Sequence, residues 1–180
     1  MEHRWSVGPV TVVMREHDGD RRGRTARGTA EALLASVVRE LAGADLPIGR
    51  RCPNCGGTDH GRPIVAGNEL VLSLSYAPGV VAVAAASADA VVALGVDVEV
   101  GDADAEAIPG LTLRDWTRVE AAMKADGRAS LLDTSAALLD RDSVRFADGR
   151  AWVTALLAAP TGFPLALAYR SRGAGRETSR

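Results

Sequence analysis

The sequence is poor in lysine and cysteine, and it contains no long apolar run. Of its 21 basic side chains only Lys124 is a lysine, and its two cysteines are too few for the disulfide framework of a small secreted domain. No stretch reaches the roughly 18 apolar residues that a membrane-spanning helix needs, and the first residues lack the basic-then-apolar order of a signal peptide. Because hydrophobic residues make up 47% of the chain, bulk disorder is excluded as well. We therefore expect a cytoplasmic protein with one compact core.

Charge is distributed unevenly along the chain. Residues 63–140 hold 12 acidic and 4 basic side chains, whereas the segments before and after them carry net charges of +2 and +4. A nucleic-acid interface would be basic over a whole face, so this pattern argues against one. An acidic middle between basic flanks suits a cation and an anionic ligand, although ordinary solvated charge gives the same counts. We expect neither a nucleic acid nor a membrane as a partner.

Apolar periodicity and turn residues predict an α+β fold. Helices are expected over residues 27–41, ending at Gly43, and over residues 113–126, between an N-cap at Thr112 with Asp115 as a weak capping box and a stop at Gly127. Strands are expected over residues 5–14, 70–75, 80–86, 91–98 and 163–169, and a hairpin over residues 143–146 and 151–158. Residues 45–68 and 102–109 are predicted as loops, and residues 129–140 as weakly helical or loop.

The order of these elements indicates two similar α/β halves. Residues 1–90 and 91–170 would each place a helix against a small antiparallel sheet, within one compact unit. No long repeat is visible by identity. A polar tail over residues 171–180 is predicted to be disordered.

Three acidic residues and the single lysine form the most informative pattern. Asp97 and Glu99 are two residues apart in GVDVE, so an extended strand through this segment puts both side chains on one face. Trp116, Glu120 and Lys124 are spaced by four residues on a predicted helix and share one stripe of it. If that stripe faces the end of the strand, three carboxylates converge with one ammonium group a turn away.

Such a cluster needs a compensating charge, because three nearby carboxylates repel and are costly to bury. Mg²⁺ provides it, since this ion prefers oxygen ligands and is often shared between carboxylates and substrate phosphates. A neighbouring lysine supplies a compact charge for a phosphate. The spacing also fits two acids at an exposed strand end and an ordinary Glu120–Lys124 pair on a solvated helix, so spacing alone leaves both interpretations open.

Four ordered segments resemble the 4′-phosphopantetheinyl transferases, specifically the surfactin-synthetase-activating type. The segments are HGRP at 60–63, SLSY at 73–76, GVDVE at 95–99 and WTRVEAAMKADG at 116–127. The resemblance implies a fold of two α/β halves related by a pseudo-two-fold axis within a monomer. It also implies transfer of the 4′-phosphopantetheine arm of coenzyme A to a serine of an acyl or peptidyl carrier protein, with release of adenosine 3′,5′-bisphosphate.

The resemblance also implies roles for individual residues. Asp97, Glu99 and Glu120 would hold Mg²⁺ on the pyrophosphate, and Lys124 would contact the phosphate or assist proton transfer. Either Glu120 or a Mg²⁺-bound water would take the serine proton. Coenzyme A would be contacted by a set of polar and basic positions: Arg24 or Arg27, His60, Arg62, Ser75 and Tyr76.

Two positions depart from the family pattern. Tyr76 stands where a histidine is common, and its hydroxyl donates hydrogen bonds but carries no charge at neutral pH. Val119 stands where a lysine is common, and the stretch between Glu99 and Trp116 is short. The alternative is therefore a degenerate member of the family that binds coenzyme A or a carrier protein without transfer.

The remaining motif is a Cys-x-x-Cys pair followed by a histidine. Cys52, Cys55 and His60 offer three zinc ligands, but no fourth is evident, because Asp59 is a poor candidate and His3 or His17 would have to fold in. A thioredoxin-like redox role is disfavoured, since the pair lies in a Pro/Gly-rich loop and does not open a helix after a strand. Zinc binding by this loop remains an open alternative.

Overall fold

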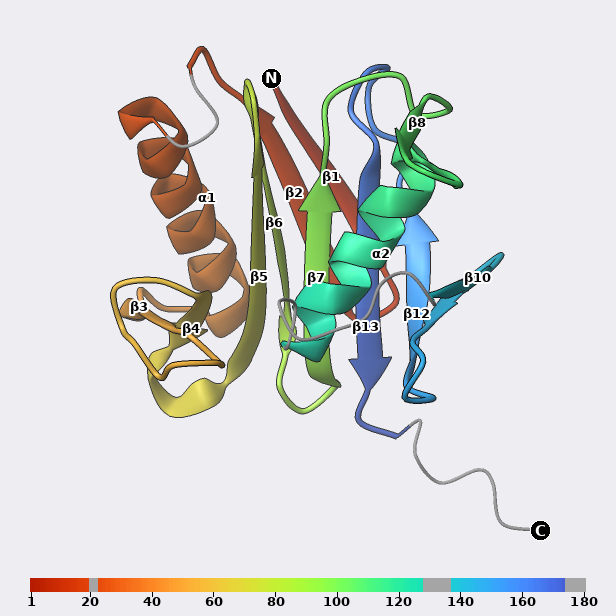
Figure 1. The fold of residues 1–180 in the computed structure, drawn as a ribbon. Helices are drawn as coiled ribbons and strands as arrows, with labels where there is room; N and C mark the ends of the chain where they lie inside the picture. The colour runs from red at the N-terminus through yellow and green to blue at the C-terminus, as the bar shows by residue number, and fades with distance from the viewer. Residues whose placement is uncertain (20–22, 128–136, 174–180) are drawn as a thin grey trace, which may run out of the picture.

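The computed structural model describes residues 1–19, 23–127 and 137–173. Two antiparallel sheets stack face to face, and one helix covers the outer face of each sheet (Figure 1). The predicted α+β class is confirmed. Within the described residues no helix is long and apolar enough to span a membrane.

The first sheet has six strands and carries helix α1 (Arg24–Ala42). Its strands, in spatial order, are β1 (Glu2–Val7), β2 (Val10–Glu16), β6 (Val80–Ser87), β5 (Leu70–Ala77), β4 (Arg62–Val65) and β3 (Ile48–Arg51). A short 3-10 turn, η1 (Ala66–Asn68), follows β4.

The second sheet has five strands and carries helix α2 (Leu113–Asp126). Its strands, in spatial order, are β10 (Leu138–Asp140), β11 (Ser143–Arg145), β12 (Ala151–Leu156), β13 (Leu165–Ser171) and β7 (Val91–Val98). A small hairpin of β8 (Glu106–Ile108) and β9 (Leu111–Thr112) precedes α2.

The two sheets follow the same chain order. In the first, β2 is followed by α1 and then by β3 to β6, and the spatial order is β2-β6-β5-β4-β3. In the second, β7 is followed by α2 and then by β10 to β13, and the spatial order is β7-β13-β12-β11-β10. The chain passes from one sheet to the other between Ser87 and Val91. Strand β1 and the β8–β9 hairpin are additions to this shared order.

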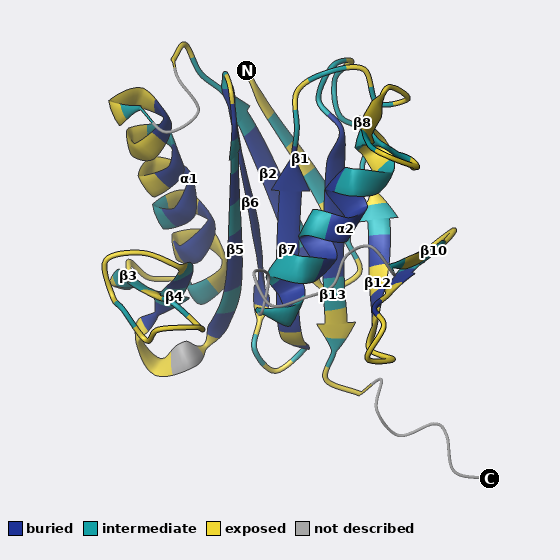
Figure 2. Ribbon diagram, viewed as in Figure 1, coloured by how far each residue is buried: buried dark blue, intermediate teal, exposed yellow. Residues whose placement is uncertain are grey.

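The core has three layers, and β6 belongs to two of them. Alternate residues of β6 face the second sheet (Ala82, Ala84, Ala86) and helix α1 (Val81, Val83, Ala85). A strand covered on both faces requires a continuous apolar run, which explains its sequence VVAVAAAS. Figure 2 shows the same burial along β7, which lies between the first sheet and α2.

Both helices end as the sequence predicts. Gly43 has a positive φ of 71°, and its N–H group donates to the carbonyl of Arg39. Gly127 has a φ of 84° and donates to Met123 in the same way. At the start of α2, the Thr112 side chain accepts a hydrogen bond from the Asp115 N–H, which confirms the N-cap.

Gly95 brings α2 close to β7. A Cβ atom at this position would lie 2.0 Å from the Ala121 carbonyl oxygen and 2.5 Å from the Ala125 nitrogen, so only glycine permits the observed contact. The acidic residues at the end of β7 are thereby held against the middle of α2.

Several sequence-based boundaries are wrong. The strand predicted over residues 5–14 is a hairpin, because Gly8 (φ 54°) and Pro9 form a two-residue turn between the paired Val7 and Val10. The predicted loop over residues 45–68 contains β3 and β4, which have only four residues each and lie among the prolines and glycines that suggest a loop. The loop predicted over residues 102–109 likewise includes β8.

The C-terminal predictions also shift. Most of the segment 129–140 lies outside the described residues, but its end forms strand β10. The last strand runs two residues further than predicted, since Ser171 still pairs with Val91 and the Arg172 N–H donates to the Ala90 carbonyl. The predicted tail beyond residue 173 lies outside the described part of the chain.

Candidate functional site

Three carboxylates lie together where β7 ends against α2. One carboxylate oxygen from each of Asp97, Glu99 and Glu120 lies within 4.8 Å of the others. Asp97 is only 1% exposed, whereas Glu99 and Glu120 are half-buried. The structure thus brings together the three acids that the sequence places on a strand and on one helix stripe.

Lys124 and Ser75 complete this acidic cluster. The Lys124 ammonium group donates to Asp97 Oδ1 at 2.5 Å and to Ser75 Oγ at 2.8 Å. Ser75 in turn donates to Asp97 Oδ1 at 2.8 Å and accepts from the Val98 N–H at 3.3 Å. Since Ser75 is 2% exposed, its hydroxyl holds the cluster together and does not face an open surface. The network joins β5, β7 and α2.

The second carboxylate oxygen of Asp97, Oδ2, is buried and accepts no hydrogen bond within the described part of the chain. Buried polar atoms are normally paired, so this oxygen suits a bound cation. The carboxylates of Asp97, Glu99 and Glu120 together form an all-oxygen donor set, which is the set that Mg²⁺ prefers.

Burial and neighbouring charges raise the pKa of Glu120 to about 8. Burial has the largest effect, followed by the negative charge of Asp97; Glu99 adds to the rise, and Lys124 opposes it. Without a bound cation, the Glu120 carboxyl group is therefore largely protonated at neutral pH. A divalent cation beside it would restore the carboxylate.

A cleft of about 320 Å³ opens beside the cluster, between the first sheet and the end of α2. Arg62, Tyr76 and Lys124 line it. A second hollow, of about 520 Å³, is lined by Arg27 and His60 and by the acidic Glu31 and Asp59, and it shares Arg50, Gly61 and Tyr76 with the cleft. We refer to the two as the cleft and, after its arginines and histidine, the basic hollow.

The remaining predicted residues differ in whether they line one of these two cavities. Arg27 lines the basic hollow, whereas the exposed Arg24, at the first position of α1, is not among the described residues that line either cavity. Of the two arginines that the sequence leaves open as coenzyme A contacts, the position of Arg27 therefore suits this role better. Arg50 is an addition, which sequence reasoning missed because it lies in a short strand that was predicted as a loop.

Arg62 connects the first sheet to the end of α2. Its guanidinium group donates to the main-chain carbonyl oxygens of Lys124 and Ala125, which belong to the last helical turn, where carbonyl groups have no acceptor role within the helix. Burial lowers its pKa, and the charge of Asp126 opposes this effect. Arg62 thus lines the cleft and also fixes one wall of it.

Val119 points away from the site. It is 0% exposed and packs between α2 and the second sheet with Ala93, Ala166 and Ala168. A lysine side chain at this position would enter an apolar core in this fold. The valine is therefore explained by packing.

Scans against protein-family models and against curated proteins find no match to the chain. What the chain does is therefore inferred from its own residues and their arrangement. The four segments that carry the resemblance come together in space: each contributes to the acidic cluster or to the cleft.

Proposed function

We propose that the protein transfers the 4′-phosphopantetheine arm of coenzyme A to a serine of an acyl or peptidyl carrier protein. The reaction is Mg²⁺-dependent and releases adenosine 3′,5′-bisphosphate. The observation that carries the proposal is the acidic cluster of Asp97, Glu99 and Glu120, which Lys124 joins to a cleft built from the segments that resemble this family.

The arrangement of the fold supports the same proposal. We interpret the repeated strand order of the two sheets as a pseudo-two-fold relation between an N-terminal and a C-terminal half. The acidic cluster then lies at the junction of the halves, because Ser75 belongs to the N-terminal half while Asp97 and Lys124 belong to the C-terminal half.

The donor set fits a magnesium ion. Asp97, Glu99 and Glu120 would hold it, and when bound it would neutralise charge on the pyrophosphate of coenzyme A. Lys124 adds a second positive charge at the edge of the cleft. Phosphoryl transfer depends mainly on positioning and charge neutralisation, and this combination would supply the charge neutralisation.

The proposed reaction is a displacement at phosphorus. The serine oxygen of the carrier forms a bond to the phosphorus on the pantetheine side while its proton passes to Glu120 or to water, and the bond from that phosphorus to the bridging oxygen breaks. The adenosine bisphosphate leaves with this oxygen. Arg27 and Arg50 in the basic hollow suit the phosphates of the leaving nucleotide, because guanidinium groups bind phosphate through charge-assisted hydrogen bonds.

The direct test is an assay with apo-carrier proteins. The protein is incubated with coenzyme A, Mg²⁺ and a panel of acyl and peptidyl carriers, and intact mass spectrometry follows the gain of a phosphopantetheine group on serine. We expect modification of at least one carrier. No gain across a broad panel on which an active transferase works would refute the proposal.

Matched variants connect activity to the acidic cluster. Asp97→Asn and Glu120→Gln should each lower turnover by at least a hundredfold while circular dichroism shows a retained fold. Asp45→Asn and Glu69→Gln make the same chemical changes at exposed positions and should leave turnover unchanged. Equal rates in all four variants would mean that the metal site is misassigned.

A second candidate function is binding of coenzyme A or a carrier protein without transfer. It is favoured by Tyr76, which lines both cavities and offers an uncharged hydroxyl where the family commonly has a histidine. This alternative predicts coenzyme A binding by calorimetry without any carrier modification. It also predicts that Tyr76→His introduces measurable transfer, whereas ready turnover by the wild-type protein would exclude it.

A further inference from the structure

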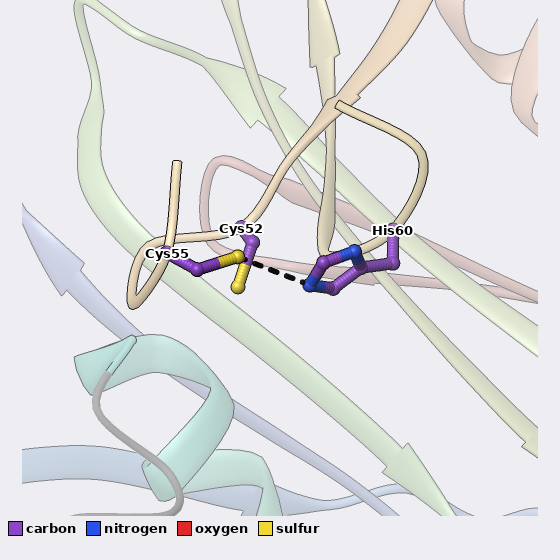
Figure 3. Close-up of side chains that lie close together, drawn as sticks. All are labelled: Cys52, Cys55 and His60. Atoms are coloured by element: carbon purple, nitrogen blue, oxygen red, sulfur yellow. Dashed lines mark hydrogen bonds between the residues drawn. The ribbon is translucent and has the colours of Figure 1, made fainter. Parts of the chain in front are cut away.

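The loop between β3 and β4 brings two thiols and an imidazole to one point (Figure 3). Arg51 and Arg62 are the last paired residues of the two strands, so the loop begins at Cys52. One ligand atom from each of Cys52, Cys55 and His60 lies within 4.8 Å of the others. Both cysteines are free thiols.

A tight backbone turn places the two sulfur atoms on the same side. The Gly56 N–H donates to the Cys52 carbonyl at 2.9 Å, and the Cys52 N–H donates to the Gly57 carbonyl at 2.8 Å. Gly56 has a φ of 73°, a conformation that favours glycine. The backbone of the turn therefore holds Cys52 and Cys55 close together at the start of the loop.

Asp59 orients the imidazole toward the sulfur atoms. Its Oδ1 atom lies 2.7 Å from His60 Nδ1, which leaves Nε2 facing Cys55 Sγ at 3.4 Å. A carboxylate on the far nitrogen of a metal-binding histidine is a common arrangement that fixes the ring. Asp59 thus serves as a partner of His60, which explains why it is a poor ligand itself.

The spacing of the ligand atoms fits a tetrahedral ion. With bonds of about 2.3 Å to sulfur and 2.0–2.1 Å to nitrogen, a tetrahedral zinc ion separates the two atoms by roughly 3.6 Å. The observed separation of Cys55 Sγ and His60 Nε2 is 3.4 Å. Two thiolates and one neutral imidazole would balance the charge of Zn²⁺.

Gly61 closes the loop over Cys52. It has a φ of 94°, and a Cβ atom there would lie 2.5 Å from both the Arg51 carbonyl oxygen and Cys52 Cα. This close approach returns His60 to the start of the loop. The three ligands are therefore held together by the backbone of the hairpin, and the arrangement does not depend on side-chain rotation alone.

We propose that Cys52, Cys55 and His60 bind one zinc ion whose fourth position is open to water. Zinc suits a set of two sulfur atoms and one nitrogen, and a site with three protein ligands keeps an exchangeable position. The proposal is independent of the transfer reaction. It also gives His60 a role other than the coenzyme contact implied by the family resemblance.

The zinc ion would brace the walls of both cavities. Pro53 and Asn54 of the same loop line the cleft, and Asp59 and His60 line the basic hollow. Fixing the loop would therefore fix the shape of the surface that faces Arg27 across the hollow. The inferred zinc site therefore lies at the border of the candidate site.

The test measures metal content without coenzyme A or a carrier protein. Protein purified without added zinc or chelator is assayed by elemental analysis and native mass spectrometry, and we expect one zinc per chain. Cys55→Ser and His60→Ala should each retain less than a tenth of this amount, whereas His3→Ala, which removes a histidine of β1, should retain all of it. Substoichiometric zinc in the wild type, or a Cys52–Cys55 disulfide detected as a mass loss of two hydrogens, would overturn the proposal.

Two further measurements keep the test valid if a ligand variant misfolds. Asp59→Asn leaves all three ligands in place and should weaken zinc affinity by roughly 10- to 100-fold in competition with a chelator. In the Co²⁺-substituted wild type, we expect the absorption of a tetrahedral ion with thiolate charge transfer, and added imidazole should change it by entering the fourth position. Unchanged affinity in Asp59→Asn would contradict the orientation by Asp59, and a spectrum insensitive to imidazole would contradict the open position.

Discussion

Replacing Glu120 by glutamine should change how the stability of the protein depends on pH. The pKa of Glu120 is raised from 4.5 to about 8 in the folded protein, so the folded state binds a proton more tightly than the unfolded state. Its contribution to stability is complete below pH 4.5 and is lost as the pH rises toward 8. Glutamine has the same shape, offers Asp97 a hydrogen bond and never ionises. The variant should therefore escape this loss.

The size of the effect follows from the shift in pKa. Each pH unit between the two pKa values corresponds to about 1.4 kcal/mol, which sets a ceiling of about 5 kcal/mol. Relaxation around the half-buried carboxylate and the charge of Lys124 reduce this, so we expect on the order of 3 kcal/mol. For a chain of this length, that corresponds to a relative fall in Tm of roughly 6–12 °C.

The assay compares Tm values of wild type and Glu120→Gln between pH 5 and pH 8.5, in one chelating buffer so that any loss of zinc is common to both. The wild-type Tm should fall relative to that of the variant as pH rises, and Glu69→Gln, an exposed control, should follow the wild type. Adding Mg²⁺ in excess over the chelator at pH 8 should restore most of the wild-type loss and change the variant much less. Parallel pH profiles for wild type and Glu120→Gln would refute the reasoning.

The remaining predictions concern packing, and chemical denaturation measures each of them. Gly95→Ala should lower the free energy of unfolding by more than about 4 kcal/mol, because its Cβ would meet the backbone of α2. Gly28→Ala in α1 should raise it by about 0.5–1 kcal/mol, because a Cβ at this position meets no atom within 4 Å. Arg118→Met should cost roughly 2–4 kcal/mol, since the buried guanidinium group donates to Thr154 and to three carbonyl groups around β10 and β11; a cost below about 1 kcal/mol would contradict this role. Val119→Lys should destabilise by several kcal/mol and should not raise any transfer rate, because the side chain would enter the core; increased transfer would contradict the packing explanation.

The parts of the fold that the sequence predicts well are those with local signals. Thr112 and Gly127 mark both ends of α2, and the Pro78–Gly79 turn separates two strongly apolar strands, β5 and β6. By contrast, the hairpin of β1 and β2 is hidden in a continuous β-branched stretch, in which only Gly8 and Pro9 mark the turn. Strands β3 and β4 have only four residues each, and they depend on pairing with the rest of the sheet.

In the acidic cluster, too, the sequence predicts what local spacing determines and misses what depends on contacts between elements. Periodicity places Glu120 and Lys124 on one stripe and Asp97 and Glu99 on one face, because the first pair lies within α2 and the second lies at the end of β7. The contact between helix and strand depends on Gly95, whose role is visible only when α2 is in place. The i,i+4 spacing suggests Glu120 as the partner of Lys124, but the structure gives Lys124 a salt bridge to Asp97, whose buried carboxylate attracts it more strongly.

This salt bridge explains why a chain rich in arginine carries a lysine here. The Lys124 ammonium group donates to two acceptors, Asp97 Oδ1 and Ser75 Oγ, and still has a third N–H proton to offer at the edge of the cleft. An arginine would bring a wide fork of five N–H groups to the same place, where two acceptors lie close together and Asp97 is almost fully buried. The unpaired N–H groups would then lie between the carboxylates that are proposed to hold Mg²⁺. A compact cation therefore serves the folded protein and the proposed phosphate contact with the same atom, and the chain keeps its single lysine where those two requirements coincide.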